Sequence, residues 1–164
     1  MKHSDPALSK LSLKNPIHFL ALGFGSGLAP KAPGTFGTLA ALPLYFIMMN
    51  LSLPVFIVIT LFITVVGFWI CDIAAKDMQV HDHGAIVWDE VAGMLITMIA
   101  APVGLLPLVV GFALFRFFDI IKPWPIKLLD RHVKGGFGIM IDDVLAGVFA
   151  AICLQAIHYF WPLV

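Results

Sequence analysis

Two pairs of adjacent carboxylates stand out because each pair interrupts an apolar stretch. Asp89 and Glu90 lie within IVWDEVAGMLITMIAA, and Asp142 and Asp143 lie within IMIDDVLAGVFAAI. A single acid at a helix N-terminus is commonly explained by the helix dipole or by capping of free N–H groups. Clustered acids beside hydrocarbon are costly and usually functional. Because Mg²⁺ prefers oxygen ligands and often retains water for a phosphate substrate, we predict that these four acids form a catalytic Mg²⁺ site.

The loop before the first acidic pair, AKDMQVHDHGAIVWDE, contains further candidates for catalysis. Asp82 shortly precedes the pair and is predicted to act in catalysis or metal binding. His83 is predicted to move a proton to a leaving group. Zinc binding by these residues and His81 is disfavoured, because a well-separated third ligand is missing. A solvated turn ended by Gly84 is the alternative, and the sequence leaves it open.

Basic residues and one glycine-containing turn are the candidates for phosphate binding. Arg116, Asp119 and Lys122 are spaced so that they can share a face at the end of a helix. Arginine offers a planar fork to phosphate oxygens and lysine a point charge, although snorkelling and topology marking are alternative roles. Upstream, KAPGTFGTLAALP places Thr35 as the expected N-cap of an apolar helix. The same helix start presents backbone N–H groups to an anion, with Lys31 nearby.

The composition indicates that an integral membrane protein positions these residues. Of the 164 residues, 60% are hydrophobic and 12% are charged, whereas a soluble domain is nearer half apolar and a quarter charged. The uncharged stretches at residues 32–71, 91–115 and 144–164 each reach the roughly 20 apolar residues that span a bilayer. Ten basic and ten acidic residues cancel, and no nucleic-acid partner is predicted.

Breaks within these stretches predict an all-α bundle of about five short membrane spans. The segment NLSLP divides the first stretch into helices at about 35–49 and 54–75. The stretch at 91–115 is either one tilted span or two short helices turning at 102–107. Two helices place every Lys and Arg on one side, which the positive-inside rule assigns to the cytoplasm together with the N-terminus. All acidic residues then fall on that side, so the chemistry is predicted at the cytoplasmic membrane surface.

The N-terminal region is expected to add no complete span. Three glycines in GFGSGLAP make it a poor spanning helix, and an interfacial or re-entrant segment without signal-peptide cleavage is expected. We predict a cytoplasmic N-terminal extension at 1–14 and a single membrane domain at 15–164. Cys71 and Cys153 lie in apolar segments and are expected to form no disulfide.

Four long motifs resemble, in the same order, those of the phosphatidylglycerophosphatase A family. They read GFGSGLAPKAPGTFGTLAALP, AKDMQVHDHGAIVWDEVAGM, FRFFDIIKPWPIKLLDR and GGFGIMIDDVLAGV, and the resemblance covers roughly residues 15–162. It implies a multi-pass enzyme of the bacterial inner membrane. Such an enzyme uses Mg²⁺ to convert phosphatidylglycerophosphate to phosphatidylglycerol, in the synthesis of phosphatidylglycerol and cardiolipin.

Two mechanisms and a second class of function are compatible with the same residues. Attack by a metal-activated water is expected first, and a covalent aspartyl-phosphate second; the sequence does not separate them. A small transporter or channel for cations or protons would place charges within the spans, whereas these acids gather at one surface. A CDP-alcohol phosphotransferase is disfavoured because its long Asp-Gly…Ala-Arg…Gly…Asp…Asp pattern is absent.

Overall fold

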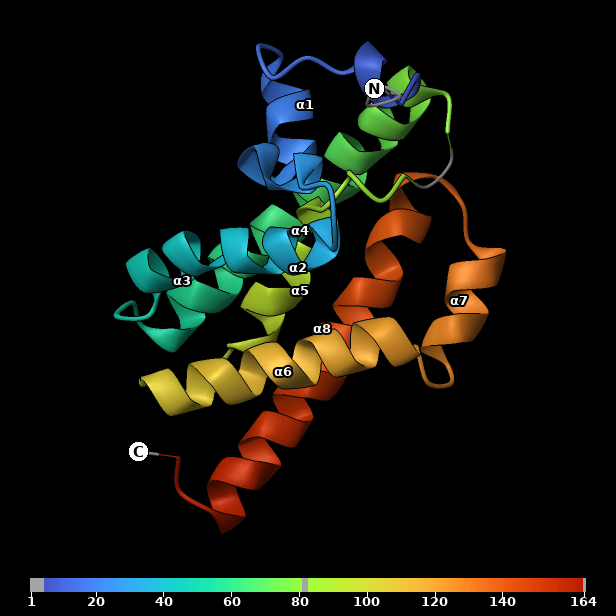
Figure 1. Ribbon diagram of the computed structural model, residues 1–164. Helices are drawn as coiled ribbons and strands as arrows, with labels where there is room; N and C mark the ends of the chain where they lie inside the picture. The colour runs from blue at the N-terminus through green and yellow to red at the C-terminus, as the bar shows by residue number, and fades with distance from the viewer. Residues whose placement is uncertain (1–4, 81–82, 164) are drawn as a thin grey trace.

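The computed structural model describes residues 5–80 and 83–163, and every regular element within these residues is helical (Figure 1). The prediction of an all-α fold is therefore confirmed. In chain order the helices are η1 (Leu8–Lys10), α1 (Pro16–Ala21), η2 (Gly23–Leu28), α2 (Pro33–Ala40), α3 (Leu42–Met48), α4 (Leu53–Met78), α5 (Trp88–Thr97), α6 (Leu105–Ile121), α7 (Ile126–His132) and α8 (Gly135–Phe160).

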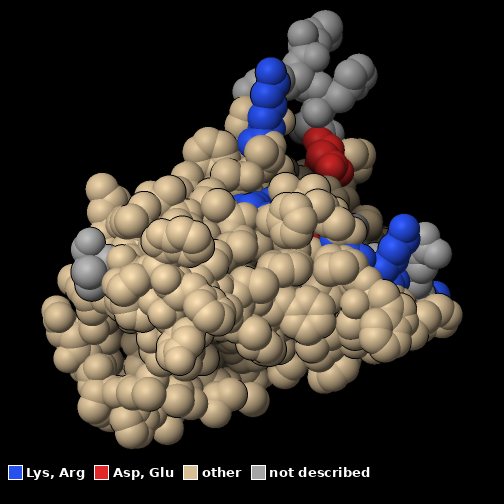
Figure 2. All heavy atoms as spheres, turned by 90° about the horizontal axis from the view of Figure 1, so that it is seen from below, with Lys and Arg blue, Asp and Glu red and all other residues tan. Residues whose placement is uncertain are grey.

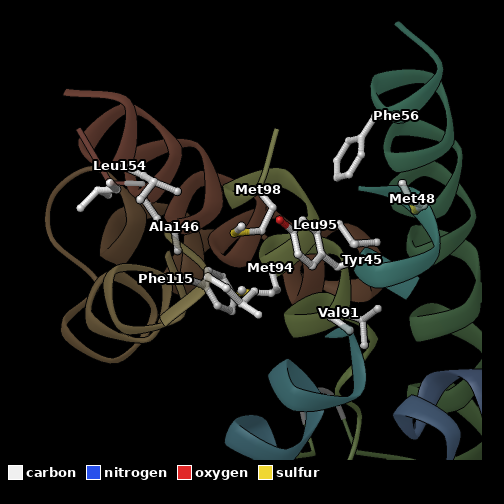
Figure 3. Packing of buried hydrophobic residues seen from close by; sticks show 14 of the residues in the cluster. Tyr45, Met48, Phe56, Val91, Met94, Leu95, Met98, Phe115, Ala146 and Leu154 are labelled. Atoms are coloured by element: carbon white, nitrogen blue, oxygen red, sulfur yellow. The ribbon is translucent and has the colours of Figure 1, made fainter. Parts of the chain in front are cut away.

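The short helix α5 lies at the centre of the bundle, in contact with α2, α4, α6 and α8. After Glu90 every residue of α5 is buried, which suits a helix that is apolar on all sides. Met94 and Leu95 belong to the main buried cluster, together with Tyr45 from α3 and Phe115 from α6 (Figure 3). The central position of α5 carries the two acids of its first turn into the interior of the molecule.

Glycines allow α8 to cross its neighbours with the backbones in contact. A Cβ atom at Gly147 would lie 2.5 Å from the carbonyl oxygen of Gly93 in α5. A Cβ atom at Gly136 would collide with the carbonyl oxygen of Phe68 in α4. Small residues commonly permit such close crossings in membrane proteins. α8 is therefore held against both α4 and α5, which fixes its rotation about its own axis.

The beginning of α8 differs from the sequence-based expectation. In the sequence, Gly135, Gly136 and Gly138 favour turns, which predicts that the second acidic pair begins the next helix. Instead α8 begins at Gly135, and Asp142 lies about two turns inside it. The expectation that both pairs open a helix is correct for α5 and wrong for α8, because these glycines serve a close helix crossing.

The first apolar stretch contains one more break than predicted. The helix expected at 35–49 is divided into α2 and α3 at Ala41. Pro43, in the first turn of α3, donates no backbone hydrogen bond and its ring excludes the carbonyl of Leu39, so one continuous helix cannot form. The next helix, α4, begins directly after Ser52, which confirms the break predicted at NLSLP.

The stretch at 91–115 forms two helices, α5 and α6, as one of the two alternatives predicted. The break lies at residues 98–104, slightly earlier than expected, and Ala100 there has a left-handed φ of 57°. Pro107 lies in the first turn of α6, where the backbone N–H has no helical partner and its absence costs little.

Two helices of the described residues, α4 and α8, are long and apolar enough to cross a membrane, with 26 residues each. α5 has ten residues and a length of about 15 Å, half the thickness of the hydrocarbon core. The expectation of about five spans therefore stays a prediction. Figure 2 shows one broad face almost without charged side chains, which gather along one edge.

The N-terminal region packs on the end of α4 and forms no continuous helix. Lys10 Nζ donates to the carbonyl oxygen of Met78 at 3.2 Å and to Gln79 Oε1 at 2.7 Å. Within η2, Phe24 and Gly25 have φ values of 60° and 92°, which break the helical path. This irregular backbone agrees with the expected poor spanning helix. The two cysteines form no disulfide, as predicted.

Candidate metal and phosphate site

Three carboxylates from two helices form the core of the candidate site. Asp89 and Glu90 belong to the first turn of α5, and Asp143 comes from α8. One carboxylate oxygen from each of the three lies within 4.8 Å of the others. The crossing of α5 and α8 at Gly93 and Gly147 brings these side chains together, since each glycine lies four residues after Asp89 or Asp143 and hence on the same helix face.

The three carboxylates offer oxygen ligands for a divalent cation, and some of their oxygens have no other partner. Asp89 Oδ1, Glu90 Oε2 and Asp143 Oδ2 are buried, and none has a hydrogen-bond partner among the described residues. Buried polar atoms are normally hydrogen-bonded because an unsatisfied one costs free energy. Mg²⁺ prefers oxygen ligands, and these three carboxylates could supply them. The residues therefore fit Mg²⁺.

Asp142, the fourth predicted ligand, contacts a lysine and lies outside this group of three. Its Oδ2 atom accepts a hydrogen bond from Lys122 Nζ at 2.5 Å. Lys122 is the C-cap residue of α6 and has a left-handed φ of 45°. The structure thus brings together three of the four acids, and metal binding by Asp142 stays a prediction.

Arg116 reaches the edge of the carboxylate group from α6. Its Nη1 atom lies 2.6 Å from Asp119 Oδ2 and 4.0 Å from Glu90 Oε1. The side chain is 16% exposed, and its Nε atom is buried without an acceptor among the described residues. A guanidinium group with an unused donor beside a candidate metal site is well suited to bind a phosphate oxygen.

Asp119 is a site residue that was missing from the predicted ligands. It is the ion-pair partner of Arg116, and its carboxyl group also interacts with that of Asp143. Its side chain is only 14% exposed. The i, i+3 spacing from Arg116 was the sequence signal for its position. Asp119 therefore links the arginine to the carboxylate group.

The start of α2 lies directly against this site. A Cβ atom at Gly34 would collide with Glu90 Oε1 and would lie 3.2 Å from Arg116 Nη1. The N-cap residue is Ala32, and Thr35 is the third residue of α2, so the prediction that Thr35 is the N-cap is wrong. Pro33 starts the helix one position after Ala32, because its fixed φ suits the first helical residue.

Two other predicted phosphate ligands, Lys31 and Thr35, lie on either side of this helix start. Lys31 is exposed in the turn before α2, and Thr35 is half-buried. Thr38, one turn further on, accepts a hydrogen bond from Arg116 Nη1 at 3.5 Å. α2 thus positions the arginine, while phosphate binding by Lys31 and Thr35 stays a prediction.

His83 contacts the N-terminal extension and its own loop. Its Nε2 atom lies 2.7 Å from Asp5 Oδ2, and its Nδ1 atom accepts the N–H of Ala85 at 3.1 Å. Because Nδ1 accepts, Nε2 carries the proton and donates to Asp5. This hydrogen bond holds the pKa of the Asp5 carboxyl below its ordinary value. Asp82 and His81 lie outside the described residues, and the catalytic roles of Asp82 and His83 stay predictions.

Comparison with known proteins identifies the family. The sequence profile of phosphatidylglycerophosphatase A matches residues 19–158. Phosphatidylglycerophosphatase A of Escherichia coli is 49% identical over 163 residues, covering 99% of this chain and 95% of the relative. The Haemophilus influenzae enzyme of the same name is 48% identical over 165 residues, covering 99% of this chain and the whole relative.

A more distant relative has a different name. A Bacteroides thetaiotaomicron protein, provisionally named a phosphatidylinositol-3-phosphatase, is 36% identical over 152 residues, covering 85% of this chain and 92% of the relative. No solved structure matches the chain. The profile match and the two nearly full-length identities place this chain in the phosphatidylglycerophosphatase A family.

Proposed function

We propose that this protein hydrolyses the phosphate monoester of phosphatidylglycerophosphate, with Mg²⁺ held by Asp89, Glu90 and Asp143. One observation carries the proposal: the carboxylates of Asp89, Glu90 and Asp143 gather near Arg116, and each has a buried oxygen without a hydrogen-bond partner among the described residues. Membership of the family supports the choice of substrate, because two relatives are named for this activity. The products are phosphatidylglycerol and inorganic phosphate.

Each group of the site has a role in this proposal that follows from its position. The chemistry that Mg²⁺ supplies at such a site is neutralisation of phosphoryl charge and activation of a water molecule. Arg116 binds a phosphoryl oxygen, and Gly34 lets Glu90 and Arg116 approach the start of α2 closely. A bond forms between water oxygen and phosphorus as the bond from phosphorus to the glycerol oxygen breaks. The glycerol oxygen takes up a proton, for which Asp82 and His83 are the proposed carriers.

The proposed site lies at the cytoplasmic surface of a bacterial inner membrane. Asp72, near the C-terminal end of α4, accepts the N–H of Gly136 at the start of α8, at 3.1 Å. These two candidate spans therefore run in opposite directions, with these ends on one side. Lys76 and Lys134 lie at the same ends, which supports a cytoplasmic location by the positive-inside rule. The proposal also includes further membrane spans, which the shorter helices would form.

Cysteine labelling tests this topology. In a variant without Cys71 and Cys153, a cysteine at Ser52 or Val103 is expected to react with an impermeant reagent added to the periplasm. A cysteine at Lys134, next to Gly135, should react only after the cytoplasmic side is opened. All three positions are exposed to reagent in the folded protein. Periplasmic labelling at Lys134 would contradict the orientation and move the proposed site across the membrane.

Phosphate release by purified protein in detergent is the direct test of the activity. We expect release from phosphatidylglycerophosphate with Mg²⁺, loss of release on chelation with EDTA, and recovery when Mg²⁺ is restored. Phosphatidylinositol 3-phosphate should be assayed in parallel, because the Bacteroides relative is named for that lipid. Failure to release phosphate from phosphatidylglycerophosphate with Mg²⁺ present would overturn the proposal.

Arg116 is expected to contribute more to substrate binding than its charge alone provides. Arg116→Ala should lower kcat/KM by about 10- to 100-fold, the range for a lost hydrogen bond to a charged group. Arg116→Lys should restore little if two donors are used.

Lys122→Ala should also weaken substrate use. Kinetics on mixed micelles give these values, with Lys127→Ala as the control because Lys127 is an exposed cation on α7. Unchanged kinetics in both alanine variants would assign Arg116 and Lys122 to topology marking.

A further inference from the structure

An apolar groove lies along the flank of α2 and α3, close to the candidate site. Its volume is about 530 Å³, which falls within the range of roughly 300–1,000 Å³ for small-molecule sites. The groove is lined by residues of η2, of the end of α2 and of the first turn of α3, namely Gly23, Phe24, Ser26, Ala40, Pro43 and Leu44. The lining is almost entirely apolar, so the groove suits a hydrocarbon chain.

One residue of the lining, Ser26, gives the groove a polar feature that the fold does not use. Its Oγ atom is buried and has no hydrogen-bond partner among the described residues. A buried hydroxyl without a partner costs free energy, so a turn of the Ser26 side chain toward the groove would gain a hydrogen bond if a ligand there offered an acceptor. An ester carbonyl at the head of an acyl chain provides an acceptor followed by hydrocarbon. This combination matches the groove.

The distance between the groove and the proposed phosphate position fits the same ligand. Gly34 and Ala40 are six residues apart on α2, which is about 9 Å along the helix axis and about 120° around it. In phosphatidylglycerophosphate about eleven bonds join the terminal phosphorus to an ester carbonyl, an extended length of roughly 13 Å. Phosphatidylinositol 3-phosphate has the same number of bonds between these groups.

We infer that this groove binds the acyl-ester end of the lipid substrate, with Ser26 donating to the ester carbonyl, while the terminal phosphate lies beside Arg116, near the start of α2. α2 then spans the headgroup: its first turn faces the phosphate, and its last turn borders the ester and the first part of the chain. The inference rests on the proposed function, because it names the path of the lipid that the site would hydrolyse.

A bulky side chain in the groove tests the inference. Ala40→Phe should raise KM for long-chain phosphatidylglycerophosphate at least tenfold and leave kcat nearly unchanged. Leu39→Phe is the matched control, because Leu39 is the neighbouring residue and is 42% exposed on another face of α2. Glycerophosphoglycerophosphate, which lacks both acyl chains, should be hydrolysed equally well by wild type and by Ala40→Phe.

Ser26→Ala separates ligand binding from a structural role. The variant should raise KM for the long-chain lipid by about threefold to tenfold, which is the change expected for the loss of one hydrogen bond. Its thermal unfolding temperature in detergent should be unchanged or higher, because a buried polar atom without a partner has been removed. A lower unfolding temperature together with an unchanged KM would show that the hydroxyl supports the fold, and would overturn its role in binding the ester.

The remaining outcomes distinguish this inference from the proposed function. If Ala40→Phe leaves KM for the long-chain lipid unchanged while wild type hydrolyses it, bulk lipid fills the groove and the inference is wrong, but the proposed function stands. Equal losses with the lipid and with its deacylated form would mean that Ala40→Phe disturbs α2, which also overturns the inference. If wild type releases no phosphate from either compound, the proposed function fails and the inference fails with it.

Discussion

Replacing Asp89 or Asp143 with asparagine is expected to lower kcat by about a thousandfold, equivalent to about 4 kcal/mol of transition-state stabilisation, without loss of folding or membrane insertion. The amide keeps the shape of the carboxylate but removes the charge that is proposed to hold Mg²⁺. It also removes repulsion between buried acids, so the unfolding temperature of the metal-free protein should stay the same or rise. Glu90→Gln should behave in the same way.

The dependence of activity on Mg²⁺ concentration distinguishes a metal ligand from a helix cap. Each of these three variants should need more Mg²⁺ for its residual activity than wild type does. Asp77→Asn is a suitable control, because Asp77 lies at the end of α4 and pairs with His18 outside the carboxylate group. If the three amide variants keep near-native kcat at low Mg²⁺, the acids are not ligands and serve only the fold.

Asp142→Asn provides a finer comparison within the second acidic pair. In the structure Asp142 pairs with Lys122, so its loss should reduce activity less than the loss of Asp143 and should leave the Mg²⁺ requirement close to that of wild type. A Mg²⁺ requirement raised as far as in Asp143→Asn would instead support the sequence-based prediction of four ligands.

Much of the site could be predicted because its chemistry is local in the sequence. Asp89 and Glu90 precede an unbroken apolar stretch, which correctly indicated acids in the first turn of a buried helix. The break at NLSLP followed from its helix-terminating residues, and the break between α5 and α6 was favoured by the placement of every Lys and Arg on one side. The grouping of both acidic pairs into one site was supported by the cost of isolated acids beside hydrocarbon.

The choice between Asp142 and Asp143 could not be predicted, because it depends on how α8 is rotated. Adjacent residues on a helix differ by about 100° in direction, so one acid of the pair faces α5 and the other faces elsewhere. The contact of Gly147 with Gly93 settles the rotation, and Asp143 shares the face of Gly147. The spacing shared by the two stretches is the sequence signal for this choice: Asp89 and Asp143 each lie four residues before the glycine of the crossing.

Gly34→Ala is the second change expected to have a large effect, and its effects on activity and on stability should have opposite signs. The added Cβ would collide with Glu90 Oε1 and crowd both terminal nitrogens of Arg116. These atoms are the ends of flexible side chains, so the fold can accommodate the methyl group by moving them. Alanine also favours a helix over glycine by up to about 1 kcal/mol. The unfolding temperature should therefore stay the same or rise.

Activity should fall, because the side chains that move are those proposed to bind Mg²⁺ and phosphate. A displacement of about 1 Å in a positioned group can cost about a hundredfold in rate, so we expect a loss of that order in kcat/KM. Gly84→Ala is the matched control: Gly84 is exposed, and the nearest neighbour of its added Cβ would be Pro33 Cγ at 4.0 Å. Kinetics and thermal unfolding of both variants would be compared at saturating Mg²⁺. Near-native kcat/KM in Gly34→Ala would mean that the contact between α2 and Glu90 does not form part of the reacting site.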